Sequence, residues 1–267
     1  MKEESIVNGR VRIQYQIRKG RGIPLIFLHG GMGSSCIWKL MEPDFIDMTS
    51  SIVFPDLRGH GLSDRPLSKD DYLLEKHVDD INKIIDHHRF KEVILIGHCL
   101  GAMVTATYVY YYPEKIRKLV LINPGCGVPW YISNKIIKNI LSFICRKIIG
   151  ANIIKSQKKR VDYFRFINTF DFNPKRIWAD LKIMGTSSLA NQFMALMEWD
   201  GTNYLKKINK PTLIIAGTKD LIFPPGETEK VWSLVPHAKL VYLKTNHVSV
   251  LNNTREVFAV LKAFIST

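Results

Sequence analysis

The chain has 267 residues, of which 46% are hydrophobic and 23% charged. This length and composition favour one globular domain, with or without an inserted subdomain, and exclude a low-complexity or disordered chain. The net charge of +14 suits an anionic partner. Because no aromatic-basic interleaving or recognition motif accompanies that charge, nucleic acid is not an expected partner.

The first segment of the chain is polar and is followed by an alternating one. Residues 1–5 lack the apolar run of a signal peptide, and no segment approaches about 18 uncharged apolar residues. We therefore expect a cytoplasmic protein without a membrane span. Residues 5–15 alternate around Asn8-Gly9, which predicts an antiparallel hairpin.

Short apolar runs follow the hairpin and end in Gly, Pro or Asp. They cover residues 24–28, 52–54, 93–96, 119–122, 212–216 and 240–243. Continuous runs of this kind are typical of strands that are covered on both faces. Helical patterns lie between most of them, over residues 72–88, 100–111, 227–234 and 254–265. The alternation predicts an α/β fold with a parallel sheet and helices on both sides.

The alternation stops between about residues 128 and 209, where helical patterns occur without a convincing strand. We expect an inserted helical cap at 128–209, and a core formed by residues 1–127 and 210–267. One cap helix is expected over 132–148, because its apolar residues share one arc and its polar residues lie opposite. The apolar set is Ile132, Ile136, Ile137, Ile140, Leu141, Ile144 and Ile148, and the polar set is Lys135, Lys138, Ser142 and Arg146.

Two interpretations of this helix follow from its amphipathic pattern. Packing of the apolar arc against the rest of the cap, with a solvated basic face, is favoured over a helix that lies on a membrane surface. The surrounding stretch is nevertheless strongly basic, since residues 115–161 hold eleven Lys and Arg and no Asp or Glu. An anionic substrate and an anionic membrane surface are therefore two hypotheses for a partner of the cap.

Residues 94–102, Ile-Leu-Ile-Gly-His-Cys-Leu-Gly-Ala, place Cys99 where a predicted strand turns into a helix. Small residues on both sides, here Gly97 and Gly101, permit a tight turn from which the side chain between them projects beyond the sheet. That is the position of a nucleophile. A Gly-flanked cysteine can also be a small buried residue under a helix, so the interpretation depends on other segments. The remaining cysteines, Cys36, Cys126 and Cys145, form no C-x-x-C pair, which predicts reduced thiols.

A glycine-rich loop after the first buried strand, residues 28–35, can turn backbone N–H groups toward a ligand. The N–H groups of Gly31 and Leu100 are the candidates for an oxyanion hole, Leu100 being at a helix N-terminus. A thiol also needs a base. His247 follows the last buried strand and is expected at the same sheet edge as Cys99, whereas His29 and His60 are interpreted as structural. Asp220 follows the preceding strand and is the candidate acid that orients His247.

The order nucleophile, acid, histidine, together with His29-Gly30-Gly31, residues 56–64 and Gly97-His98-Cys99-Leu100-Gly101, resembles the α/β-hydrolase superfamily over nearly the whole chain. The resemblance implies an eight-stranded, mostly parallel sheet and a helical cap inserted after the sixth strand. It also implies a catalytic triad of Cys99, Asp220 and His247, with the oxyanion hole at the backbones of Gly31 and Leu100. Most members have serine at the position of Cys99.

The function expected from this site is hydrolysis of an ester, lactone or thioester through an acyl-Cys99 intermediate. Two alternatives stay open: transfer of the acyl group to another acceptor, and a receptor that binds its ligand without turnover. Met32, His98, Trp130 and Phe223 are candidate substrate contacts. Further apolar cap residues are expected to line the pocket: Tyr131, Phe143, Phe164, Phe166, Phe193, Met194 and Met197. We expect no cofactor and no metal.

Overall fold

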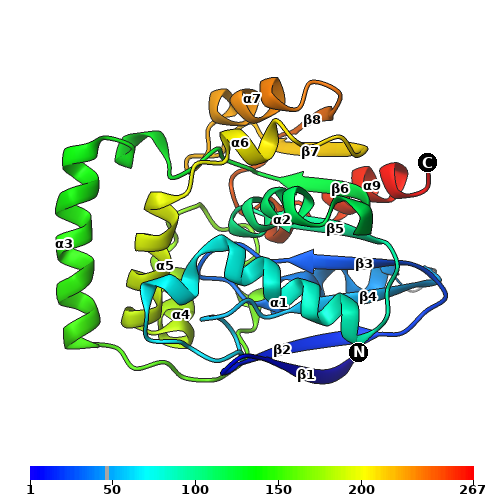
Figure 1. The fold of residues 1–267 in the computed structure, drawn as a ribbon. Helices are drawn as coiled ribbons and strands as arrows, with labels where there is room; N and C mark the ends of the chain where they lie inside the picture. The colour runs from blue at the N-terminus through cyan, green and yellow to red at the C-terminus, as the bar shows by residue number, and fades with distance from the viewer. Residues whose placement is uncertain (46–47) are drawn as a thin grey trace.

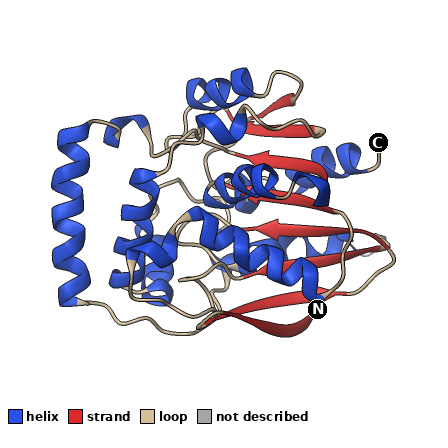
Figure 2. Ribbon diagram, in the orientation of Figure 1, coloured by secondary structure: helices blue, strands red, loops and turns tan. Residues whose placement is uncertain are grey.

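The computed structural model describes residues 1–45 and 48–267 and contains one eight-stranded sheet (Figures 1 and 2). The strands are β1 (Lys2–Asn8), β2 (Val11–Arg18), β3 (Gly22–Leu28), β4 (Ser50–Pro55), β5 (Val93–His98), β6 (Ile116–Ile122), β7 (Thr212–Gly217) and β8 (Lys239–Leu243). Their order across the sheet is β1-β2-β4-β3-β5-β6-β7-β8. The sheet is parallel from β4 to β8, while β2 pairs antiparallel with both β1 and β4. The predicted fold class is therefore confirmed.

Helices cover both faces of the sheet (Figure 2). The α-helices are α1 (Leu74–His87), α2 (Leu100–Tyr111), α3 (Lys135–Ala151), α4 (Pro174–Met184), α5 (Thr186–Glu198), α6 (Thr202–Leu205), α7 (Pro225–Leu234), α8 (Ser249–Asn252) and α9 (Thr254–Ile265). The described residues also form five 3-10 helices: η1 (Ser35–Phe45), η2 (Lys69–Tyr72), η3 (Pro113–Lys115), η4 (Trp130–Ile132) and η5 (Tyr163–Phe166). The strand and helix patterns of the core were predicted within a few residues, but η1 was not.

The central strands alternate between two apolar layers. In β3, Ile26 and Leu28 pack with α1, α2 and α7, whereas Leu25 and Phe27 pack with η1 and α9. All four side chains are fully buried. Since side chains of a strand point to opposite faces in turn, a strand covered on both faces must be apolar at every position. This explains why the predicted strands are continuous apolar runs.

Between β6 and β7 the chain forms α3, α4, α5 and α6, which lie beyond the carboxyl ends of the parallel strands (Figure 1). We call residues 128–209, which lie between these two strands in the sequence, the inserted segment. Helix α5 lies between the sheet and α3, and α3 packs along α5 as the outermost helix of the view (Figure 1). Among the described residues, no helix is both long enough and apolar enough to cross a bilayer.

The predicted orientation of the helix over 132–148 is wrong for most of its apolar arc. Ile136, Ile140 and Ile144 are 69%, 55% and 45% exposed in α3 and face outward, whereas Leu141 and Ile148 of the same arc are half-buried. The side that packs on α5 includes Lys138, which was assigned to the solvated face. Its Nζ donates a hydrogen bond to the carbonyl oxygen of Met197 at 2.9 Å. A long lysine stem can lie along a helix interface while its ammonium finds a carbonyl, which periodicity alone does not reveal.

Candidate active site

The turn from β5 to α2 holds Cys99 in a backbone conformation that L-residues rarely adopt. Its φ is +52° and its ψ is −109°, and it forms the N-cap of α2. The Cys99 N–H donates to the carbonyl of Ile122 in β6 at 3.0 Å, so the turn is tied to the neighbouring strand. Strained conformations of this kind persist only where the surrounding structure enforces them, and they cluster at functional sites.

Two glycines make this turn possible. A Cβ atom at Gly97 would lie 2.2 Å from the carbonyl oxygen of Gly101, and one at Gly101 would lie 2.2 Å from the carbonyl oxygen of Leu28. Both obstructions are backbone atoms, which cannot rotate away as a side chain can. The requirement for small residues on both sides of Cys99 is therefore a matter of close backbone approach between β3, β5 and α2.

The structure brings the three predicted triad residues together at the carboxyl edge of the sheet. Asp220 follows β7, His247 follows β8, and Cys99 follows β5. The Nδ1 atom of His247 lies 2.8 Å from Oδ2 of Asp220, and the Cys99 side chain is near enough to the His247 ring to act on its pKa. Because Nδ1 is engaged by the carboxylate, Nε2 is the nitrogen left for the thiol. Asp220 and His247 are 2% and 7% exposed, so solvent screens this chain of contacts little.

Four hydrogen bonds hold the carboxylate of Asp220 in place. Oδ1 accepts from the backbone N–H groups of Ile222 and Phe223, both at 2.8 Å. Oδ2 accepts from Nδ2 of Asn123 at 2.8 Å in addition to its bond with His247. A carboxylate with both oxygens saturated has one stable orientation, and it fixes the imidazole in the tautomer that carries a proton on Nδ1.

The electrostatics of the triad favour a protonated His247. Burial by itself lowers the pKa of His247, but the negative charges of a Cys99 thiolate and of Asp220, with hydrogen bonds to both, outweigh it and raise the pKa to about 10. For Asp220, burial acts to raise the pKa, and the bond to His247 with its charge outweighs this and lowers the pKa below the ordinary value. The pair of Asp220 and His247 is therefore a carboxylate beside an imidazolium, each of which stabilises the charge of the other.

Two positioning residues were missed by the sequence analysis. Asp171, which is 5% exposed, accepts from the backbone N–H of His247 through Oδ1 at 2.8 Å and from that of Leu221 through Oδ2 at 2.9 Å. Asn123 accepts from the hydroxyl of Ser249 at 2.6 Å while it donates to Asp220. Asn123 directly follows β6 at the carboxyl edge, which was a usable signal. Asp171 belongs to the inserted segment, and nothing in its local sequence indicates its partners.

The predicted oxyanion donors lie next to each other beside Cys99. A Cβ atom at Gly31 would be 4.0 Å from the Cβ of Leu100, and both residues line the same cavity as Cys99. Within the described part of the chain, no acceptor is bonded to the N–H of Gly31 or of Leu100. Leu100 is the first residue of α2, whose N-terminal N–H groups have no partner inside the helix. Two free donors beside a nucleophile suit a developing oxyanion.

The cavity over Cys99 has a volume of about 230 Å³ and is lined in part by the inserted segment. Met32 and Phe223 line it, as predicted, and so does Phe193 of α5. Among its described lining residues none is charged, and Gln192 is the only polar side chain besides Cys99. The Gln192 amide oxygen already bonds Nε2 of His77 at 3.0 Å. The cavity therefore suits an uncharged, apolar group.

Other predicted substrate contacts differ. His98 does not line the cavity: it is 4% exposed, and its Nε2 donates to the carbonyl of His247 at 2.8 Å. Burial, followed by the charge of His247, lowers the pKa of His98 to about 3, so its ring is neutral and acts as a structural support. His98 is the last residue of β5, and its side chain points beneath the turn rather than into the cavity. The prediction that it contacts substrate is wrong for this reason. Phe143 is 60% exposed on α3 and lies outside the cavity lining. The Trp130 side chain lies outside what the structure describes.

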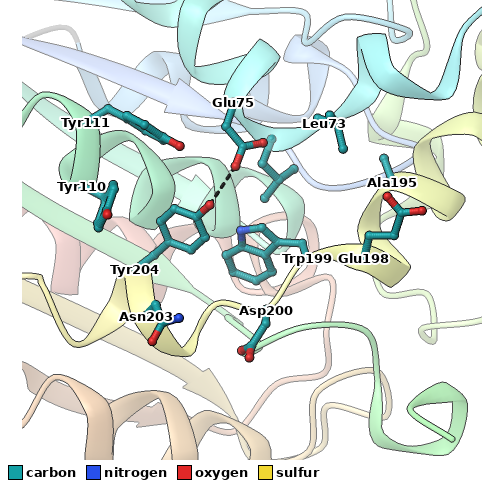
Figure 3. A pocket seen from close by; sticks show the side chains of 11 residues that line it. Leu73, Glu75, Tyr110, Tyr111, Ala195, Glu198, Trp199, Asp200, Asn203 and Tyr204 are labelled. Carbon is teal, nitrogen blue, oxygen red and sulfur yellow. Dashed lines mark hydrogen bonds between the residues drawn. The ribbon is translucent and has the colours of Figure 1, made fainter. Parts of the chain in front are cut away.

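A second hollow of about 330 Å³ lies between α1, α2 and the α5–α6 junction (Figure 3). It contains Glu75, Trp199 and Tyr204 but none of the triad residues. The Tyr204 hydroxyl donates to Glu75 at 2.7 Å, and the Trp199 ring stacks on the Tyr204 ring, so these groups are already engaged with each other (Figure 3). We therefore place the candidate site at Cys99.

One potential metal-ligand group occurs among the described residues and lies apart from the triad. Ligand atoms of Glu4, His87 and His88 lie within 4.8 Å of one another, at β1 and the end of α1. This is the end of the sheet opposite the inserted segment (Figure 1). The hydroxyl of Tyr15 lies 2.9 Å from Nε2 of His88 and donates to Oε2 of Glu4 at 3.2 Å, so two of the three ligands already have a hydrogen-bond partner. The triad chemistry does not involve this group.

The chain is similar to known proteins over its full length. A family described as alpha/beta hydrolase fold matches residues 23–138. A proline iminopeptidase of Heyndrickxia coagulans is 26% identical, over 98% of this chain and 97% of that protein. Among solved structures, a hydrolase from Pseudomonas aeruginosa superposes with a TM-score of 0.81 at 19% identity, covering 99% of this chain and 98% of the other. The enol-lactonase of Burkholderia xenovorans has a TM-score of 0.79 at 16% identity, covering 99% and 100%.

Substitution of Gly97 or Gly101 by Ala is expected to destabilise the protein by about 1–3 kcal/mol or more, because the added methyl overlaps backbone atoms. The matched control is Gly150→Ala in α3, where a Cβ meets nothing within 4 Å. That control should leave the free energy of unfolding equal or slightly higher, since Ala is the better helix former. Urea unfolding followed by circular dichroism measures the free energy of unfolding of the three variants. Equal stability of Gly101→Ala and Gly150→Ala would contradict the packing argument.

Removal of the Cys99 sulfur is expected to lower the pKa of His247. In Cys99→Ala the charge and hydrogen bond of Cys99 disappear, while burial continues to disfavour the imidazolium, so the ring should lose its proton at a lower pH than in the wild type. Nuclear magnetic resonance of ring-labelled histidine follows the titration. Cys126→Ala is the control and should leave the pKa unchanged. An identical His247 titration in Cys99→Ala would show that no thiolate faces the ring.

Proposed function

Since this chain belongs to the α/β-hydrolase superfamily, we propose that it cleaves a carboxylic ester, lactone or thioester through a covalent acyl-Cys99 intermediate. The observation that supports this most directly is the contact chain from the Cys99 thiol through the His247 ring to the Asp220 carboxylate. The three residues come from separate loops at one sheet edge. That geometry supports the roles of nucleophile, proton carrier and orienting anion that we propose for them.

The first half of the reaction begins with the thiol proton on His247. The sulfur of Cys99 attacks the carbonyl carbon, an S–C bond forms, and the carbonyl π pair moves to the oxygen. The N–H groups of Gly31 and Leu100 are placed to stabilise this oxyanion. When the intermediate collapses, the bond to the leaving oxygen or sulfur breaks. His247 returns its proton to that leaving group, and the acyl group remains on Cys99 as a thioester.

In the second half a water molecule replaces the leaving group. His247, now neutral, takes a proton from the water as its oxygen attacks the thioester carbonyl. The same two N–H groups donate hydrogen bonds to the oxyanion, the S–C bond breaks, and the carboxylic acid leaves. The sulfur recovers the negative charge while His247 keeps the proton, so the cycle closes. Asp220 holds the ring throughout, because its four hydrogen bonds prevent rotation.

The substrate class follows from the cavity. With a volume of about 230 Å³ and no charged lining residue among those described, it can take an apolar acyl chain of moderate length but offers no counter-ion to a charged one. Met103, Leu189 and Leu196 add to its apolar wall. We propose that residues 128–209 act as a cap whose helices set the length of chain that fits.

Acyl transfer is the second candidate, and the cysteine itself favours it. A thioester on Cys99 can be resolved by an alcohol or a thiol as well as by water, so the same intermediate serves both reactions. Release of free acid at the same rate with and without added alcohol or thiol acceptors supports hydrolysis. A rate that depends on the acceptor supports transfer. Release of one equivalent and no more would indicate a receptor without turnover.

The nucleophile is tested by intact-protein mass spectrometry after incubation with p-nitrophenyl esters and acyl thioesters of increasing chain length. We expect an adduct with the mass of the acyl group on the wild type and none on Cys99→Ala. Asp220→Asn should lower turnover by about 10³ to 10⁴-fold, since the imidazole loses its orienting anion. Cys126→Ala is the matched cysteine control and should retain both adduct and turnover. An adduct that persists in Cys99→Ala would overturn the mechanism.

Selective alkylation gives an independent test. Burial raises the pKa of the Cys36 and Cys145 thiols and raises that of Cys126 to about 11, which keeps these three protonated at neutral pH. Iodoacetamide at pH 7 should therefore modify Cys99 first, because His247 accepts its proton. In His247→Gln the rate at Cys99 should fall by about tenfold or more. Peptide mapping identifies the site, and equal rates at Cys99 and Cys126 would contradict the activated thiol.

A further inference from the structure

The outward face of α3 is apolar and exposed. Ile136, Ile140, Phe143 and Ile144 are 69%, 55%, 60% and 45% exposed. They recur at intervals of three and four residues and so form one continuous stripe along the helix. Scattered exposed hydrophobic residues are normal, but a contiguous stripe of large side chains on one helix indicates an interaction surface. We call these four residues the α3 stripe.

The exposure of the α3 stripe does not come from a poorly packed helix, because the opposite side of α3 packs against the protein. Cys145 on that side is 7% exposed, and Lys138 bonds the carbonyl of Met197 in α5. Asn134 caps the helix by accepting from the N–H of Ile136 at 2.8 Å, and Asn152 ends it in a left-handed conformation. Helix α3 is thus a defined element with one face against α5 and the other free (Figure 1).

Cations accompany the stripe. Lys147 lies within it, with its Nζ 5.5 Å from the centre of the Phe143 ring, and Lys135 and Arg146 lie at its side. In the part of the chain that the structure describes, none of these three residues forms an ion pair. The sequence from 115 to 161 contains no acidic residue. The charge next to the stripe is therefore uncompensated by the protein.

We propose that α3 docks this protein on the surface of a bilayer that contains anionic phospholipid. Apolar side chains on one face of a helix, flanked by lysine and arginine, are the composition that lies in a bilayer interface with the helix axis parallel to the surface. Ile136, Ile140, Phe143 and Ile144 enter the boundary of the acyl chains. Lys135, Arg146 and Lys147 meet the lipid phosphates, and α5 remains on the protein side.

A second copy of this chain fits the stripe less well. In a two-fold dimer through α3, both partners contribute the same surface, so each would bring Lys135, Arg146 and Lys147 to one apolar contact. Like charges held in a desolvated interface oppose association. An anionic bilayer supplies both an apolar layer for the α3 stripe and negative charge for the adjacent cations.

The stripe also lies close in sequence to the candidate active site. Val128 and Pro129 line the cavity over Cys99, and α3 begins at Lys135. Docking through α3 would hold α5, which packs on α3 and lines the cavity, near the membrane, from which apolar acyl substrates can be drawn. The docking itself needs no turnover, so it stands or falls independently of the proposed hydrolase chemistry.

Vesicle sedimentation tests the apolar part of the proposal. Full-length protein is mixed with vesicles of phosphatidylcholine alone or of phosphatidylcholine with phosphatidylglycerol. We expect binding to the mixed vesicles to be much stronger, and the double variant Ile140→Glu, Phe143→Glu to lose it. Val7→Glu is the control, because Val7 is 60% exposed on β1 and does not belong to the α3 stripe. The double variant and Val7→Glu should both keep their activity on a soluble ester. The inactive variant Cys99→Ala should bind vesicles like the wild type.

The charge part is tested by Lys135→Gln, Arg146→Gln and Lys147→Gln. Each cation near an anionic surface contributes enough that its removal should weaken binding about fivefold, and the effect should shrink as salt rises. Equal binding of the wild type to neutral and anionic vesicles, or unchanged binding of the double variant, would overturn the proposal. So would a concentration-dependent dimer that the double variant abolishes while neither protein binds vesicles, since a second copy would then cover the stripe.

Discussion

The close backbone approach at the turn after β5 is the constraint on which the site depends. Gly97 and Gly101 let α2 start against β3 and β5, and Cys99 between them takes a φ of +52°. Because Cys99 is held by the sheet on one side and opens α2 on the other, its sulfur has a fixed position and the N–H of Leu100 is presented beside it. The other proposed functional groups are arranged around that fixed point.

The inserted segment is coupled to the site rather than attached beside it. Asp171 accepts hydrogen bonds from the backbones of both His247 and Leu221, so a carboxylate from the inserted segment holds the two loops that carry His247 and Asp220. The same segment supplies Phe193 and Leu196 to the cavity. A rearrangement of these helices would therefore alter the cavity and the placement of His247 together. Membrane contact through α3, which packs on α5, would act on the same assembly.

Much of the fold and of the candidate site was predictable from local patterns. Strands covered on both faces are continuous apolar runs, and loops at their carboxyl ends collect polar residues, which is why Cys99, Asp220 and His247 could be named. The errors came from contacts between distant segments. His98 was assigned to the substrate because it neighbours Cys99, yet its side chain lies under the turn against the His247 carbonyl. Asp171 was missed because its partners are 50 and 76 residues away.

By itself, the sequence determined the sheet, the strained turn and the identity of the three proposed catalytic groups, because each depends on apolar periodicity or on residue types within a short segment. The tertiary structure decided which face of α3 is covered. Its periodicity shows an amphipathic helix but contains no information about what lies opposite. Lys138 finds a carbonyl of α5 and the apolar stripe remains outside, since the packing partner, not the helix, determines which side is buried.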